Sequence, residues 1–356
     1  MLTLRILYII HTDWRWIKQR SHFLSEELKK KEDVFIVTKL SLRKGNLVKR
    51  KLLYHCISLP FLPFALHRIK FMVLIDKVIY VLIFKLLKNI FSYDVVIFTH
   101  PLLFQYVRWY PKTVYDMHDD NANFYDTDSF LHKYIEKVNK EALSLSNLVV
   151  FSSRYLQKKF HSNTKHSVLI RNGHQVSMES KTDSLYMLNN PKKIFYFGTI
   201  SKWFDLELLV RSLYRNNGIE YNIIGPADIS KIHHPRIKWY GPLQHSDMLK
   251  LSSLADAFVM PFRITPLILG VDPVKLYEYI SFCRPVIVKY YSEISQFQPF
   301  VYFYYDEKSY HLLIDRLLTN TLPPKKKNKE IHDFLINSSW GIRAEEMLTA
   351  IKKRIF

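Results

Sequence analysis

Short, mostly apolar runs alternate with longer amphipathic segments along the chain, and this pattern predicts the secondary structure. Each run is three to seven residues long and rich in Val, Ile, Leu, Phe and Tyr, which favours a buried strand. The runs predicted as strands are 4–10, 34–37, 94–99, 113–117, 148–152, 167–170, 193–197, 221–225, 237–241 and 286–288. Helical periodicity fills intervals such as 130–145. Strand–helix alternation predicts parallel sheets covered by helices, so the expected fold class is α/β.

The alternation stops and then starts again near the middle of the chain, which predicts two domains. The polar segment 174–190 has neither periodicity and is expected to be a linker. With 356 residues, the chain is long enough to form two sizeable hydrophobic cores.

Two histidines and an aspartate follow the predicted strands of the first half. His11 and Asp13 come after the run 4–10, and His100 comes after the run 94–99. Because loops at the carboxyl ends of parallel strands face the ligand crevice, we expect these side chains to bind an acceptor. The alternative for His11 and Asp13 is ordinary capping and loop contacts.

A histidine and two aspartates, His118, Asp119 and Asp120, follow the run 113–117. Two close carboxylates raise the pKa of one of them, and a loop at a strand end is open to substrate. Asp119 is therefore the candidate general base or partner of an acceptor hydroxyl, with His118 and Asp120 beside it. The alternative is an acidic loop that only caps the following segment.

A predicted helix begins within the segment 261–288, near Asp272 and Pro273. Proline suits the first helical turn, and aspartate is a good capping residue. Lys275 in that turn opposes the helix dipole, unless an anionic ligand such as a phosphate binds there. Glu278 lies one turn deeper and could accept hydrogen bonds from a ribose diol. The alternative is an exposed ion pair between Lys275 and Glu278.

Three glycines each end a predicted strand of the second half: Gly198, Gly225 and Gly241. Gly198 precedes a helix, so its loop is a candidate for phosphate binding, and Lys202 follows it closely. Gly225 and Gly241 are each followed by proline, which indicates turns.

The net charge of +20, from 52 Lys and Arg against 32 Asp and Glu, predicts a polyanionic partner. Much of it lies in residues 28–90, which hold 14 basic and 3 acidic side chains. The sequence lacks zinc-finger spacing, an RNA-binding aromatic motif and a recognisable helix-turn-helix pattern. An anionic membrane surface is therefore expected rather than nucleic acid.

The apolar helix predicted at 71–91 follows a basic segment with Lys39, Arg43, Lys44, Lys49, Arg50 and Lys51. Charged residues interrupt this helix, so it is not expected to span a membrane. It could lie on anionic lipid as an interfacial helix, or it could pack on the sheet as a core helix.

The cysteines and the N-terminus indicate a reducing compartment. Cys56 and Cys283 are far apart in the sequence and have no metal-ligand spacing. The first ten residues lack the basic region and long apolar core of a signal peptide. We therefore expect a cytoplasmic protein.

Four segments carry a resemblance to a known family. Residues 255–288 closely resemble the nucleotide-sugar site of GT-B glycosyltransferases, whose pattern reads roughly "aDvaliPf…nPvKlyEYlaaGkPVV". Residues 196–205 are similar to "YfGtis.wfD", 171–173 to the start of "rNGvd", and 339–343 to "sW..r". The resemblance extends over nearly the whole chain.

The resemblance implies two facing Rossmann-like domains and a returning helix. Residues 1–172 would bind the acceptor, and residues 173–340 would bind the nucleotide-sugar. Residues 341–356 would form a C-terminal helix that crosses back to the first domain.

It also implies roles for individual residues, with Lys275 at the donor phosphates and Glu278 at the ribose. The implied donor-binding set is Gly198, Lys202, Gly225, Gly241, Asp272, Lys275, Tyr277 and Glu278. No metal or other cofactor is expected, since positive groups and a helix N-terminus stabilise the departing diphosphate.

One departure bears on stereochemistry. Many retaining relatives carry a second glutamate eight residues before the position of Glu278, where this chain has Gly270. The chain is more similar to bacterial exopolysaccharide and capsule transferases, including the inverting glucuronosyltransferase of xanthan assembly. Inverting hexosyl or uronosyl transfer is therefore favoured, with Asp119 deprotonating the acceptor hydroxyl; in a retaining enzyme it would only position a substrate.

The expected partners are a UDP-sugar, a lipid-linked saccharide acceptor and the inner face of the cell membrane, where the protein would associate peripherally. Two alternatives keep the same nucleotide cleft. One is a non-catalytic scaffold of a polysaccharide assembly complex, and the other is a UDP-sugar 2-epimerase. Binding without turnover would indicate the first, and acceptor-independent interconversion of sugar nucleotides would indicate the second.

Overall fold

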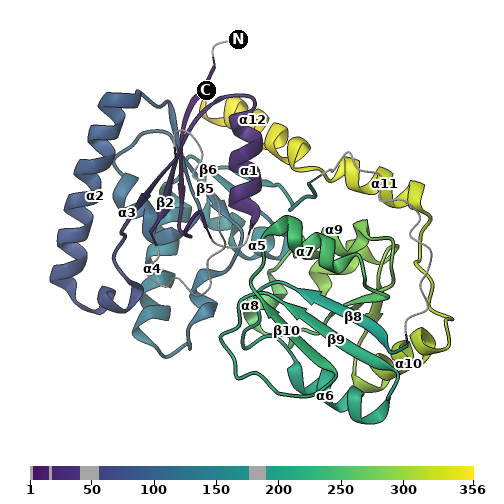
Figure 1. The fold of residues 1–356 in the computed structure, drawn as a ribbon. Coiled ribbons are helices and arrows are strands. Elements are labelled where there is room, and N and C mark those ends of the chain that lie inside the picture. The colour runs from purple at the N-terminus through teal and green to yellow at the C-terminus, as the bar shows by residue number, and fades with distance from the viewer. Residues whose placement is uncertain (1–2, 16–17, 41–55, 176–189) are drawn as a thin grey trace.

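The computed structural model describes residues 3–15, 18–40, 56–175 and 190–356, and the chain forms two α/β halves (Figure 1). Most of the predicted linker 174–190 lies outside the described residues. The same is true of five basic residues that precede the apolar helix: Arg43, Lys44, Lys49, Arg50 and Lys51.

The first half is built on a seven-stranded parallel sheet with the order β3-β2-β1-β4-β5-β6-β7. Its strands are β1 (Arg5–Ile10), β2 (Asp33–Lys39), β3 (Cys56–Leu59), β4 (Val95–Phe98), β5 (Thr113–Met117), β6 (Leu148–Phe151) and β7 (Ser167–Leu169). In β1, five of the six residues are buried. Burial on both faces explains why the strands form continuous apolar runs.

The second half repeats this plan with six parallel strands in the order β10-β9-β8-β11-β12-β13. They are β8 (Lys192–Phe197), β9 (Ile219–Ile224), β10 (Ile237–Gly241), β11 (Ala257–Met260), β12 (Val286–Lys289) and β13 (Tyr302–Tyr304). The sequence analysis missed β3, β11 and β13. Strands β3 and β13 are short and partly exposed at a sheet edge, whereas β11 is a fully buried apolar run inside the sheet.

Helices cover both faces of each sheet, which confirms the expected α/β class. In the first half they are α1 (Arg20–Lys29), α2 (Lys70–Phe91), α3 (Pro101–Val107), α4 (Phe130–Leu145) and α5 (Arg154–Phe160). The remaining helices are α6 (Leu206–Arg215), α7 (His245–Ser252), α8 (Pro266–Leu269), α9 (Val274–Ser281), α10 (Glu307–Leu318), α11 (Asn328–Asn337) and α12 (Trp340–Ile355).

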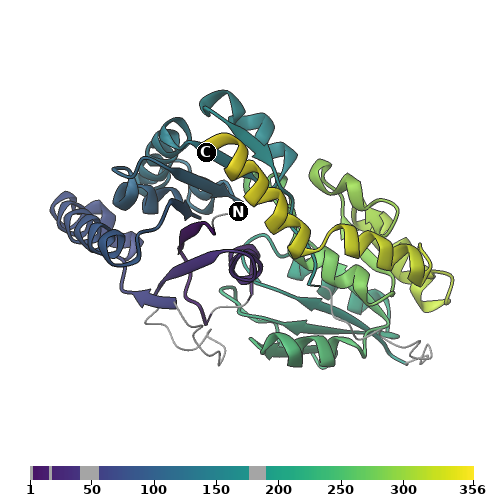
Figure 2. The same cartoon turned by 90° about the horizontal axis from the view of Figure 1, so that it is seen from above.

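The last helix, α12, returns to the first half, as predicted (Figure 2). It lies beside α1, where the rings of Phe23 and Trp340 stack with centroids 5.2 Å apart. Lys352 forms an ion pair of 2.7 Å with Glu32, next to β2. The C-terminal end of the chain therefore belongs to the core of the first half, although α10 and α11 lie against the second.

The chain passes between the halves twice, and the two crossing segments lie side by side. The His174 amide donates to the Ser338 carbonyl at 2.7 Å, and the Trp340 amide donates to the His174 carbonyl at 3.0 Å. A Cβ atom on Gly173 would lie 2.7 Å from the Ser338 carbonyl oxygen. This close approach explains why a glycine stands at the crossing.

The long helix α2 lies at the outer side of the first half, away from the second sheet (Figure 1). It buries Tyr80, Phe84 and Leu87 against the sheet, but much of its opposite side is both apolar and exposed. The alternative that α2 packs on the sheet as a core helix therefore explains its buried side and leaves its exposed apolar side unexplained. Among the described residues, none of the helices combines the length and the apolar character required to cross a membrane.

Candidate active site

A cavity of about 450 Å³ lies where the carboxyl ends of strands from both sheets meet. Many of the predicted residues line it: His11, His118, Asp119, Gly198, Gly225, Asp272, Lys275 and Glu278. The other predicted residues stand outside its lining: Asp13, His100, Asp120, Lys202, Gly241 and Tyr277. The cavity therefore brings part of the predicted acceptor side face to face with part of the predicted donor side.

Three histidines cluster on the first-half side of this cavity, because the adjacent strands β1, β4 and β5 each end just before one of them; His11 and His118 line the cavity, and His100 stands outside its lining. The His11 ring centroid lies 5.2 Å from that of His100 and 5.6 Å from that of His118. Burial, reinforced by the neighbouring histidines, holds the pKa of His11 well below its ordinary value. The same causes lower the pKa of His100 to about 3. Both rings are therefore neutral at pH 7.

Asp119 and His118 form the acidic part of the first-half wall. His118 Nδ1 lies 3.3 Å from the Asp116 carbonyl oxygen, which can only accept, so Nδ1 carries the proton. His118 Nε2 then faces Asp119 Oδ2 at 3.7 Å. Burial raises the pKa of Asp119; His118 opposes the rise and Asp120 adds to it. A carboxylate with a raised pKa is a better proton acceptor near neutral pH.

The other two aspartates predicted for the site in this half form ion pairs outside the cavity lining. Asp120 is 2.7 Å from Lys159 Nζ and also accepts from the Asn123 side chain. Asp13 forms a two-pronged pair with Arg15, at 2.7 and 3.0 Å. These contacts fit structural roles, and they leave Asp119 as the cleft carboxylate on this side.

On the second-half wall, Lys275 stands in the first turn of α9. Its Nζ donates to the Tyr196 hydroxyl at 3.0 Å and lies 4.9 and 5.0 Å from the ring centroids of Tyr196 and Phe262. Burial lowers the pKa of Lys275 to about 7, although Glu278 opposes this shift. The proposed exposed pair of Lys275 with Glu278 is wrong, because both side chains are partly buried and Glu278 bonds to His245 instead.

Two glycines let the backbone approach Lys275 closely. Gly198 and Gly225 both have φ of +139°, a conformation that side chains rarely adopt. A Cβ atom on Gly198 would lie 2.5 Å from Lys275 Nζ. A Cβ atom on Gly225 would lie 1.9 Å from the Gly198 carbonyl oxygen. The loops after β8 and β9 therefore pack against each other and against the amine with no room for a side chain.

Gly225→Ala is expected to destabilise the protein more than Gly241→Ala, which serves as the matched control. Gly241 has φ of +70°, and a Cβ there would meet nothing within 4 Å in the described part of the chain. Alanine at Gly241 should therefore cost about 1–2 kcal/mol for its left-handed backbone alone. At Gly225 the overlap with backbone should cost about 1–3 kcal/mol more. Urea unfolding measures both, and equal losses would contradict the crowding at Gly225.

Glu278 is held by a histidine that the sequence analysis did not single out. His245 Nε2 lies 2.6 Å from Glu278 Oε1, and His245 opens α7 just after β10. The His245 ring also contacts Phe23 of α1, with centroids 5.9 Å apart. His245 therefore touches the first half while it orients the carboxylate predicted to meet the ribose.

Three residues predicted to bind the donor, Asp272, Tyr277 and Lys202, instead bond to other groups of the protein. The prediction that Asp272 caps α9 is wrong, because the helix begins at Val274 with Pro273 as its N-cap. Instead, the buried carboxylate of Asp272 accepts from the Asn172 amide at 2.8 Å, and burial raises its pKa to about 6. Tyr277 points into the core and donates to Asp272 at 3.2 Å. Lys202 reaches across the cleft to the carbonyl of Phe124, at 3.2 Å.

A buried polar chain connects the two walls of the site. Arg20 Nε donates to Asp116 at 2.9 Å, two residues before His118. Arg20 Nη1 donates to the Asn172 side chain at 3.0 Å, and Asn172 in turn bonds to Asp272. The chain therefore runs from β5, which carries the acidic loop, to the start of α9, which carries Lys275.

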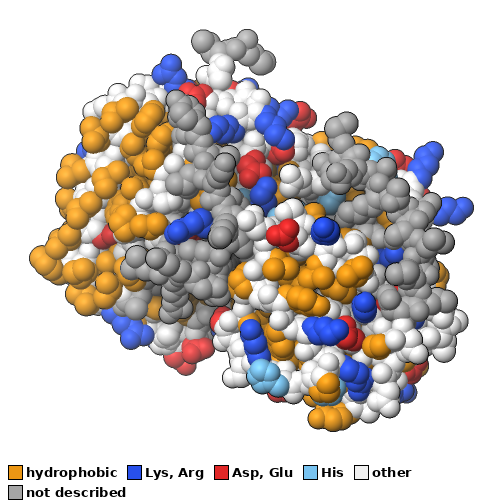
Figure 3. Space-filling model, viewed as in Figure 1, with side chains coloured by type: hydrophobic (Ala, Val, Ile, Leu, Met, Phe, Trp, Pro, Cys, Tyr) orange, Lys and Arg blue, Asp and Glu red, His pale blue; other side chains and the backbone are white. Residues whose placement is uncertain are grey.

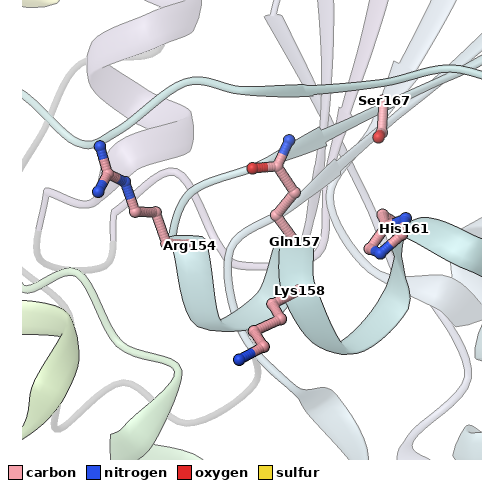
Figure 4. A pocket seen from close by; sticks show the side chains of 5 residues that line it. All are labelled: Arg154, Gln157, Lys158, His161 and Ser167. Carbon is pink, nitrogen blue, oxygen red and sulfur yellow. The ribbon is translucent and has the colours of Figure 1, made fainter.

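A second hollow lies in the first half, and Figure 4 shows the side chains that line it. Side chains of α5, of the turn that follows it and of β7 surround it: Arg154, Gln157, Lys158, His161 and Ser167. It is basic and open, but it lies apart from the predicted catalytic and donor residues.

Comparison with known proteins places this architecture. No family model matches the chain, and no curated protein matches its sequence. Among solved structures, sucrose-phosphate synthase from Thermosynechococcus elongatus matches with a TM-score of 0.75 at 15% identity, over 98% of both chains. The lipopolysaccharide outer core galactosyltransferase WaaB matches with a TM-score of 0.65 at 12% identity, over 98% of this chain and 99% of that one.

These neighbours establish the fold. The chain has the GT-B fold: two parallel-sheet α/β halves that face each other across a cleft, with a final helix that returns to the first. A protein from Listeria monocytogenes described as a UDP-N-acetylglucosamine 2-epimerase is less similar. Its TM-score is 0.55 at 10% identity, over 99% of this chain and 97% of that one.

Proposed function

We propose that this protein is a glycosyltransferase that moves a sugar from a nucleoside diphosphate donor, preferably a UDP-sugar, to a hydroxyl of a saccharide acceptor. One observation carries the proposal. Lys275, at the N-terminal end of α9 beside the closely packed Gly198 loop, lines the same cavity as Asp119 and His118. A group suited to bind a diphosphate therefore faces groups suited to accept a proton.

The donor half of this chemistry is electrostatic. As the bond between the anomeric carbon and the diphosphate breaks, negative charge develops on the leaving phosphate oxygen. The Lys275 ammonium and the backbone amides of the first turn of α9, which has no side-chain cap at its N-cap Pro273, would stabilise that charge, so the proposed reaction requires no metal ion. Glu278, oriented by His245, would accept a hydrogen bond from the ribose.

The acceptor half requires removal of a proton. In the inverting reaction that we favour, the acceptor oxygen attacks the anomeric carbon from the face opposite the diphosphate, and its proton passes to the Asp119 carboxylate. His11 and His118 line the same wall and would orient the acceptor through hydrogen bonds. In a retaining reaction, Asp119 would position a substrate without taking the proton.

We further propose that the acceptor is lipid-linked and that the enzyme acts in the synthesis of a surface polysaccharide such as capsule or exopolysaccharide, at the inner face of the membrane. The net charge of +20 supports an anionic surface as partner. The fold shared with a lipopolysaccharide galactosyltransferase is compatible with such an acceptor.

A thermal-shift screen of the purified protein against UDP, GDP, ADP, CDP and their common sugar derivatives tests the donor site. A ligand that binds only the folded state stabilises it and so raises its melting temperature. At a concentration 100 times the dissociation constant, this stabilisation is about 2.7 kcal/mol. We expect a clear shift with uridine nucleotides. A shift with none of these nucleotides would argue against the donor site.

Product analysis then separates the alternatives. We expect transfer that depends on an added acceptor, with inversion at the anomeric carbon. Nucleotide binding without turnover would indicate a scaffold. Interconversion of the sugar nucleotide in the absence of acceptor would indicate a 2-epimerase.

A further inference from the structure

The outward side of α2 exposes a continuous apolar stripe, shown at the left of Figure 3. Eight large apolar side chains on this one helix are between 38% and 69% exposed. They are Phe71, Leu74, Ile75, Val78, Ile79, Leu82, Leu86 and Ile90. Their spacing of three and four residues puts them on one face of the helix. We refer to these eight residues as the α2 face.

The rest of the described surface contrasts with the α2 face. Large apolar side chains elsewhere are exposed singly or in small groups, such as Leu254 near α7 and Leu312 on α10. A helix that is apolar on all sides is normally buried in protein or lipid. An extended apolar surface of this kind marks an interaction site.

The charges beside the α2 face are basic. Lys70, Lys77, Lys85 and Lys88 all belong to α2, whereas its single acidic residue, Asp76, is turned inward to the Tyr106 hydroxyl. On a helical wheel, the four lysines gather along one edge of the apolar stripe. An apolar surface with a positive edge complements an anionic layer that has an apolar interior.

Aromatic side chains lie under the lysines at the C-terminal end of α2. Lys85 Nζ is 5.6 Å from the ring centroid of Trp109, and Lys88 Nζ is 5.2 Å from that of Tyr110. Lys88 also donates to the Tyr93 carbonyl at 2.6 Å. Tryptophan and lysine side chains of this kind are enriched at the boundary between lipid headgroups and acyl chains, whereas Tyr110 is buried and supports Lys88 from below.

We propose that the α2 face is a membrane-docking surface, with α2 lying parallel to a bilayer of anionic lipid and its eight apolar side chains inserted among the acyl chains. At 22 residues, α2 would extend about 33 Å along the bilayer. This proposal deepens the proposed function, because the docked bilayer would supply the lipid-linked acceptor. That part of the proposal rests on the proposed function. The docking contact itself depends only on α2.

A second copy of the chain fits the α2 face less well than a bilayer does. In a symmetric pair, a second α2 would offer the lysines no negative charge, because the inward position of Asp76 leaves α2 without an exposed carboxylate. Anionic headgroups supply that negative charge. For the docked protein, the position of α2 at the outer side of the first half keeps the second half clear of the surface (Figure 1).

Flotation of the full chain with vesicles tests the proposal. One set of vesicles is phosphatidylcholine alone, and the other is phosphatidylcholine mixed with phosphatidylglycerol. We expect binding to the mixed vesicles and a loss of affinity of at least about tenfold for each of Leu74→Glu and Leu82→Glu. The matched control is Leu312→Glu, on a similarly exposed leucine of the second half, and it should bind like the wild type.

The lysines provide a second, independent measurement. Lys70→Gln and Lys85→Gln should each weaken binding to the mixed vesicles by about fivefold, and by less at high salt. Equal binding to both kinds of vesicle, or equal losses in Leu74→Glu and Leu312→Glu, would overturn the proposal. So would a wild-type dimer in analytical ultracentrifugation that Leu82→Glu converts to monomer.

Nucleotide binding keeps this test separate from that of the proposed function. The α2 variants should retain the wild-type thermal shift with UDP, because none of these residues lines the cleft. Loss of vesicle binding with an intact UDP shift supports docking through α2. Intact vesicle binding in every variant removes the docking surface while leaving the glycosyltransferase proposal standing.

Discussion

Asp119→Asn is expected to lower the rate of sugar transfer by about 10²–10⁴-fold while leaving the affinity for the donor nearly unchanged. The amide has almost the same shape as the carboxylate but cannot accept a proton from the acceptor hydroxyl. Asp119 lies on the wall opposite Lys275, so its loss should not disturb the phosphate contacts. Initial rates of transfer measure the first effect, and calorimetric titration with UDP measures the second.

Asp120→Asn is the matched control for this measurement. Its carboxylate pairs with Lys159 at 2.7 Å and lies outside the cavity lining. We expect Asp120→Asn to lower stability and to retain most of the transfer rate per folded molecule. Transfer at the wild-type rate in Asp119→Asn would show that another group takes the proton, and His118 would be the next candidate.

Lys275→Met is expected to weaken UDP binding by about 10- to 150-fold, since one charge-assisted hydrogen bond contributes about 1.5–3 kcal/mol. The methionine keeps most of the side-chain volume beside Tyr196 and Phe262 and removes the charge. Lys202→Met is the control, because Lys202 does not itself line the cavity and its Nζ donates to the Phe124 carbonyl. Unchanged UDP affinity in Lys275→Met would remove Lys275 from the donor site.

The lowered pKa of Lys275 adds a pH dependence to UDP binding. Below pH 7 the amine is already protonated, whereas above a pKa of about 7 the ligand must bind together with a proton. The affinity should therefore fall by up to about tenfold per pH unit above pH 7. In Lys275→Met this pH dependence should disappear. Titrations of the wild type and of Lys275→Met with UDP between pH 6 and about pH 9 measure the difference. A slope that persists in Lys275→Met would belong to another group.

The same pKa shift predicts that, without a ligand, Lys275→Met is more stable than the wild type at low pH. The unfolded chain holds the Lys275 proton up to its ordinary pKa of 10.5, but the folded chain holds it only up to about 7. Stability is therefore reduced by the full cost of the buried charge below pH 7, and this cost fades as the pH rises towards 10.5. Lys275→Met should melt at a higher temperature than the wild type at pH 6, with a difference that shrinks in alkaline buffer.

Much of the fold could be predicted from the sequence, because its strands are buried on both faces and therefore stand out as apolar runs. The same reasoning placed His11 and His118 at strand ends and so brought them to one wall of the cleft. Strands β3 and β13 were missed because a partly exposed edge strand need not be apolar throughout, and β11 was missed although it is buried along its whole length. For α2, the interrupting charges excluded a membrane span, but only the packing shows which side remains exposed.

The contacts that join the two walls could not be read from local patterns. Arg20 bonds to Asp116 across 96 positions, and His245 bonds to Glu278 across 33. Neither Arg20 nor His245 belongs to a motif with a fixed spacing, so their partners depend on how the two halves meet. Asp272 shows the same limit, since local sequence favoured a helix cap and tertiary contact with Asn172 prevailed.

The paired crossing of the chain has a mechanical consequence. Two covalent connections, joined by hydrogen bonds between His174 and the segment at Ser338 and Trp340, restrain the halves far more than one flexible tether would. We therefore expect the halves to move relative to each other mainly by rotation about an axis near the crossing. With α2 anchored on a flat surface, that axis would also have a defined tilt, so opening the cleft would swing the second half through one fixed arc.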